Sequence, residues 1–179
     1  NADQPCQSIS QSMSGALQQL NISYNPIEDR LLLRANAGTA GEFRVWLTRR
    51  YSVLLAKVLN DMIEKEGGMR ELASSRDTIK QLKEGALEKE YSPPMAADPA
   101  SAAGPALPLG ANGILGYRIS SNRKAGGVMN LQLLPEKGQG LNLDLDRTML
   151  FMMYNLLEQG LVGSEWNVHL SQEHKEPVH

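Results

Sequence analysis

One pattern occurs twice in this 179-residue chain and constrains its fold more than any other feature. In each copy, apolar residues alternate with polar ones, a residue suited to capping a helix follows, and apolar residues then recur at spacings of three and four. Alternation is the period of a half-buried strand, and the wider spacing is the period of an amphipathic helix. Each copy therefore predicts a strand that leads directly into a helix.

The two copies align at an offset of 98 positions. The capping residues Thr48 and Asp146 coincide, and so do Arg49 and Arg147, although few other aligned pairs are identical. Two interpretations stay open, a true internal duplication and the chance reuse of one supersecondary unit. The aligned apolar strand residues are Phe43, Val45 and Leu47 in the first copy and Leu141, Leu143 and Leu145 in the second.

Two further strands precede each copy. They are predicted over residues 20–24 and 30–37 in the first half and over 114–121 and 128–134 in the second. Short connections favour antiparallel neighbours, and glycines at 67–68 and at 160 are expected to end the helices. The sequence thus predicts an α+β fold of two tandem β-β-β-α units, residues 17–68 and 114–163, related by a pseudo-two-fold axis.

The remaining segments differ from these units in composition. Residues 69–91 carry a thin apolar stripe among many charges, which predicts an amphipathic helix that packs on the core or contacts another chain. Residues 92–113 are rich in proline and alanine and predict a linker, either a spacer or a Pro-rich docking peptide. Residues 1–16 are expected to be a polar disordered leader, and 164–179 a polar tail. The start, Asn1, suggests truncation or a cloning scar.

Composition narrows the functional classes. A net charge of -2 gives no global basic field, and a single cysteine, Cys6, can form neither an internal disulfide nor a Cys-rich zinc site. No apolar run is long enough to span a membrane, and no phosphate-binding, metalloprotease or nucleophile motif occurs. We therefore expect a cytoplasmic protein that is not an enzyme and holds no cofactor or metal. The histidines, at 169, 174 and 179, fall in the predicted tail without metal-ligand spacing.

One polar constellation supports an enzymatic alternative. Asp144 and Asp146 are two positions apart at the end of a predicted strand, so their carboxylates would share a face, and Asn142 lies on that face as well. Paired carboxylates can bind a cation or divide acid and base roles. The competing interpretation is that Asp146 caps the helix and Asp144 is an outward residue of an alternating strand.

The outward face of the first predicted sheet carries the positive functional signal. If the alternating leucines and valine point inward, then arginines, a leucine and an indole point outward together. Arginines suit phosphates, and aromatic rings stack on unpaired bases or anchor protein interfaces. The alternative is that the leader or the helix at 69–91 covers Trp46, and that Glu28, Asp29 and Glu42 pair the arginines. The candidate binding residues are Arg30, Leu32, Arg34, Arg44 and Trp46.

The order of elements, tandem sheet-then-helix units, resembles that of the Whirly and Pur nucleic-acid-binding families. This resemblance implies nucleic-acid binding. It is a likeness of predicted topology, because those families use four strands per unit where three are predicted here, and none of their motifs occurs in this chain.

These observations lead to one functional prediction with an alternative. The chain is predicted to be an interaction module that binds another protein or a second copy of itself as a homodimer. The alternative is weak single-stranded nucleic-acid binding through the arginine and tryptophan face.

Overall fold

The computed structural model describes residues 17–65 and 106–166 and has the predicted α+β architecture of two sheets, each followed by a helix. The predicted leader 1–16, the helix at 69–91, linker residues 92–105 and tail residues 167–179 lie outside the described residues. No helix in the described part of the chain is long and apolar enough to cross a membrane. The elements are β1 (Gln19–Asn25), β2 (Arg30–Asn36), β3 (Glu42–Leu47), α1 (Arg49–Lys65), β4 (Ile114–Leu115), β5 (Arg118–Arg123), β6 (Met129–Leu134), β7 (Leu141–Leu145) and α4 (Arg147–Gly163).

Both predicted junctions between strand and helix are confirmed. Helices α1 and α4 each span 17 residues, and both ends of the two helices differ by the same offset of 98. At the start of α1 the Thr48 hydroxyl accepts a hydrogen bond from the Tyr51 amide at 3.3 Å, and the Asp146 carboxylate accepts one from the Met149 amide at 2.8 Å. Each cap satisfies a backbone donor that the first helical turn leaves without a partner.

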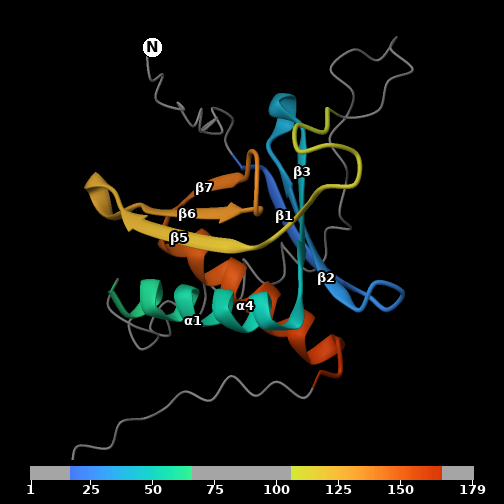
Figure 1. Ribbon diagram of the computed structural model, residues 1–179. Helices are drawn as coiled ribbons and strands as arrows, with labels where there is room; N and C mark the ends of the chain where they lie inside the picture. Colours follow the sequence, from blue (N-terminus) through green and yellow to red (C-terminus); the bar gives the residue numbers. More distant parts are fainter. Residues whose placement is uncertain (1–16, 66–105, 167–179) are drawn as a thin grey trace, which may run out of the picture.

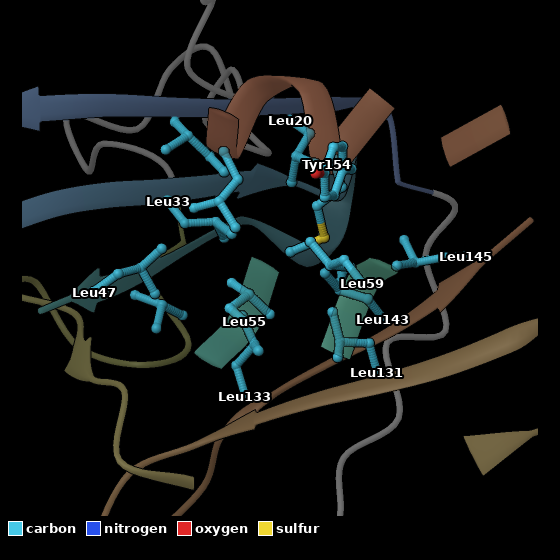
Figure 2. Close-up of a cluster of buried hydrophobic side chains, with 14 of the residues drawn as sticks. Leu20, Leu33, Leu47, Leu55, Leu59, Leu131, Leu133, Leu143, Leu145 and Tyr154 are labelled. Carbon is cyan, nitrogen blue, oxygen red and sulfur yellow. The ribbon is translucent and has the colours of Figure 1, made fainter. Parts of the chain in front are cut away.

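The two units share one hydrophobic core. The alternating apolar residues of β3 and β7 lie in the same buried cluster as the inward residues of β2, β6 and both helices. Figure 2 shows Leu33 and Leu47 from the first sheet facing Leu131 and Leu143 from the second, with Leu55 and Leu59 of α1 between them. Neither small sheet could bury its apolar face alone, so packing one unit against the other supplies the core that each requires.

The helices lie together on one side of the two sheets, and the strands of the second sheet run across the direction of those in the first (Figure 1). Helix α4 packs against α1, β7 and also β1, a strand of the other unit. At Gly160 a side chain would bring its Cβ to 3.1 Å from Ile22 and 3.2 Å from Leu31. The prediction that Gly160 ends the helix is therefore wrong, because α4 continues to Gly163 and uses this glycine for close packing.

The predicted strand at 114–121 is divided between the two sheets. Ile114–Leu115 forms β4, which pairs parallel to β3 at the edge of sheet A (order β1-β2-β3-β4). β5 pairs antiparallel to β6 in sheet B (order β5-β6-β7). The Gly116 amide donates to the carbonyl of Trp46, and the next amide, Tyr117, donates to that of Leu134. The chain therefore passes from one sheet to the other at these two residues.

Candidate interaction surfaces on the two sheets

Strand register places all five predicted binding residues on the face of sheet A opposite the core. Leu32 lies opposite Trp46, and Arg34 lies opposite Arg44, on the antiparallel pair β2 and β3. The next even position of β2, Arg30, shares that face because side chains alternate along a strand. The structure thus brings together the residues that the alternation pattern grouped.

Among the described residues, Arg30 and Arg44 on this face pair with carboxylates. The Arg44 side chain donates to Glu42, a residue only 1% exposed, and also to the Ala111 carbonyl at 3.0 Å. The side chain of Arg30 lies 3.6 Å from Glu28. Pairing of the arginines with Glu28 and Glu42 is the alternative to a binding face in the sequence analysis. Their charges are consequently offset locally, and the second pair, being exposed, contributes little to stability.

Trp46 is half-buried, and its indole N–H donates to the carbonyl of Asn112 at 2.8 Å. The leader and the helix at 69–91, which were predicted as alternatives for covering Trp46, lie outside the described residues, and the group that bonds to the indole is the Asn112 carbonyl. It comes from the end of the predicted linker, a segment that sequence reasoning treated only as a spacer or docking peptide. Leu32, opposite Trp46, is 8% exposed and stands outside the main core cluster.

The segment 106–113 runs alongside β3 and leads into β4. The Glu42 amide donates to the carbonyl of Ala106 at 2.9 Å, at the start of β3. At the other end, Gly113 has φ +70°, and a Cβ there would lie 2.6 Å from the backbone oxygen of Arg44. Only glycine combines that backbone conformation with such a close approach. Arg44 and Trp46 therefore help to hold the returning chain beside sheet A.

Two exposed apolar side chains extend this surface and were missed from sequence. Leu115, which is 45% exposed, lies next to Trp46 in the parallel ladder, and Tyr117, 70% exposed, follows two positions later. Gly116 between them is buried against the ring of Tyr51. The alternation of Leu115 and Tyr117 around this glycine is visible in the sequence and predicts that both side chains share a face. The sequence could not show that the strand would border sheet A. We call Trp46, Leu115 and Tyr117 the apolar strip.

The outward face of sheet B is polar and bonded within itself. Asn130, only 3% exposed, donates to Asn142 at 2.6 Å and to Asp144 at 2.7 Å. Lys124 donates to the Asp144 carboxylate at 2.8 Å. The Lys124 bond, followed by that from Asn130, lowers the pKa of Asp144 below its ordinary value. These side chains form one connected network across β6 and β7.

The residues proposed for an enzymatic site already have structural partners. Asp146 caps α4, while Asp144 and Asn142 belong to the network around Asn130. Among residues 17–65 and 106–166, no group of three or more histidine, cysteine, aspartate or glutamate side chains is arranged to hold a metal ion.

A third cluster, which sequence reasoning did not single out, joins the two ends of the fold. The Asp29 carboxylate accepts hydrogen bonds from the indole N–H of Trp166 at 2.7 Å and from the Tyr24 hydroxyl at 2.8 Å. The rings of Tyr24 and Trp166 meet edge to face at 5.8 Å. These bonds, from Trp166 first and Tyr24 second, lower the pKa of Asp29. The cluster fixes the end of α4 to the β1–β2 turn.

Comparison with known proteins adds no relative to this picture. No family model, curated protein or solved structure matches the chain. The likeness to the Whirly and Pur families therefore stays one of element order.

Proposed function

We propose that the protein is a non-enzymatic interaction module that binds another protein at the apolar strip and the adjoining outward face of sheet A. The observation that carries this proposal is the exposure of Leu115 beside the half-buried Trp46, with the exposed Tyr117 two positions further along the chain. Aromatic and aliphatic side chains clustered on a rigid sheet are typical anchors of protein interfaces. The five sequence-predicted residues would form the adjoining part of the contact.

The chemistry of the arginines supports a protein partner over a polyanion. The Arg44 guanidinium is engaged by Glu42 and Ala111, and Arg30 lies beside Glu28. A phosphate backbone would have to displace or approach these carboxylates, whereas an apolar contact would leave them in place. Arg30, Arg34 and Arg44 would then form the polar rim around the strip.

The experiment is site-specific photo-crosslinking from position 117 in the full chain, followed by identification of the captured protein and measurement of its affinity. Leu115→Asp should weaken that complex by at least about tenfold, because burying an aspartate in place of leucine loses apolar contact and desolvates a charge. Val162→Asp is the matched control, since Val162 is also an exposed apolar residue but lies at the end of α4.

The proposal requires the two variants to differ. Equal affinity of wild type and Leu115→Asp for the captured protein would overturn it, as would equal weakening by Val162→Asp. Light scattering on the purified chain distinguishes a homodimer from a complex with another protein. A dimer dispersed by Leu115→Asp would identify a second copy as the partner.

Single-stranded nucleic acid is the second candidate, and the register that places Arg34 beside Arg44 and Leu32 beside Trp46 supports it. Base stacking would quench Trp46 fluorescence, and affinity would fall with salt with a log–log slope of about -2 for three phosphate contacts. Oligo-dT titrated at low salt is the probe. Because the chain also contains Trp166, the Trp166→Phe variant isolates the Trp46 signal. Unchanged fluorescence would exclude this candidate.

A further inference from the structure

The outer edge of β5 pairs with no other strand among the residues that the structure describes. β5 is the terminal strand of sheet B, and within residues 17–65 and 106–166 only β6 pairs with it. Five of its six residues are exposed. Strands at such edges present backbone donors and acceptors to any extended chain that can match them.

Register identifies the backbone groups that face outward. The Lys124 amide donates to the carbonyl of Val128 at 2.8 Å, on the side of β6. Because N–H groups alternate in direction along an antiparallel strand, the backbone groups of Ile119 and Ser121 point away from β6. In the described part of the chain, no other backbone or side-chain group bonds to these two residues on that side.

Side chains around the edge determine the chemistry that an added strand would need. On the outward face of sheet B lies Arg118, which is exposed, whereas Lys124, beyond the far end of β5, already bonds to Asp144. On the core side lies Ile119, which packs against the hydrophobic cluster. An added strand would continue both faces, so it would place acidic side chains near Arg118 and apolar ones near Ile119.

The same charges act against one mode of pairing with a second copy of β5. Two antiparallel registers overlap five residues of the strand. The one that centres on Ser121 places Arg118 of each copy opposite Lys124 of the other, whereas the one that centres on Ser120 places Arg118 opposite Asn122. Like charges directly opposite each other on a sheet are destabilising. The exposed Arg118 thus disfavours the first of these registers and favours a negatively charged strand.

We propose that the outer edge of β5 binds an extended peptide that alternates acidic and apolar residues, adding it to sheet B as a further strand. Main-chain bonds to Ile119 and Ser121 supply the attachment, while Arg118 selects for acidic side chains. This site is distinct from the apolar strip and does not depend on the function proposed for it.

The test uses the full chain and two short end-blocked peptides, one alternating glutamate with valine and the other alternating lysine with valine. The first should slow amide hydrogen exchange at Ile119 and Ser121 by about tenfold at saturation, and the second should not. Slowed exchange elsewhere on the chain, with none at these two amides, would overturn the proposal. So would equal protection by both peptides.

Two pairs of variants sharpen the result. Ser121→Pro removes the outward N–H but no bond to β6, so it should abolish binding with little change in melting temperature, whereas Ser121→Ala should bind like wild type. Arg118→Glu should reverse the preference between the two peptides, and Arg118→Lys should retain it. Retained binding by a folded Ser121→Pro chain would contradict the proposal. So would concentration-dependent dimerisation that Ser121→Pro abolishes, because a second copy would then occupy the edge.

Discussion

The outward faces of the two sheets differ although the units that carry them share one topology. On sheet A, Arg44 and Trp46 bond to backbone carbonyls of a segment far away in the sequence. On sheet B, Asn130, Asn142 and Asp144 bond to one another. A repeated unit therefore conserves the inward pattern that builds the core, while its outward residues serve different purposes.

The path of the chain accounts for this difference. The segment that follows the first unit returns beside β3 and adds β4 to sheet A before it enters sheet B. No described segment adds a strand to the outer edge of β5. Sheet A consequently gains both a fourth strand and an exposed apolar border, and sheet B keeps an open edge.

The largest loss of stability is expected at Gly116, where the chain passes from one sheet to the other. Gly116→Val should lower the free energy of unfolding by about 3 kcal/mol, because overpacking displaces neighbouring groups. A Cβ at this position would lie 2.7 Å from the Tyr51 ring. Urea unfolding measures the change. Gly163→Ala is the control, since no atom lies within 4 Å of the added carbon. Wild-type stability of Gly116→Val would show that the crossing tolerates a side chain.

The next largest loss of stability is expected in the hydrogen-bond network on sheet B. Asn130→Ala should cost about 2 kcal/mol, because it removes a buried donor and leaves Asn142 and Asp144 without that bond. Gln132→Ala, on the same face of β6, should cost less because Gln132 is only half-buried. If both variants unfold at the same urea concentration, the network around Asn130 does not stabilise this face more than Gln132 does.

A smaller loss is expected on sheet A. Trp46→Phe keeps the aromatic ring but removes the N–H that bonds to Asn112, so it should cost about 1 kcal/mol. Hydrogen exchange should accelerate at Gly113 and leave the β6–β7 ladder unchanged. Tyr117→Phe serves as the control for altering an exposed aromatic ring. If Gly113 exchanges at the wild-type rate in Trp46→Phe, the indole does not hold the segment.

The smallest effect concerns acid sensitivity. The pKa of Asp144 is lowered from its ordinary 3.8, so its ionised form favours the folded state. That contribution is present above the unfolded pKa and disappears as the pH falls through the folded one. Asp144→Asn should therefore reduce stability at neutral pH and flatten its decline below about pH 4. Glu136→Gln, in the exposed β6–β7 connection, is the control. Parallel stability–pH curves for wild type and Asp144→Asn would contradict this assignment.

Much of the fold follows from local pattern. The alternation of Phe43, Val45 and Leu47 predicted β3, and the caps Thr48 and Asp146 predicted where both helices begin. Alternation also grouped the five candidate binding residues on one face. Sequence could not locate the apolar strip, because the neighbour of Leu115 is Trp46, which is 69 positions earlier in the chain.

The sequence by itself determined which side chains face inward and where strand gives way to helix, because these depend on residues within one or two turns of each other. Tertiary structure alone decided how the units share their core, why Gly160 lies inside α4, and how residues 114–123 divide between two sheets. A glycine in the sequence marks only the absence of a side chain. Whether that absence ends a helix, admits a neighbouring strand or allows a chain to cross between sheets depends on which atoms the fold places beside it.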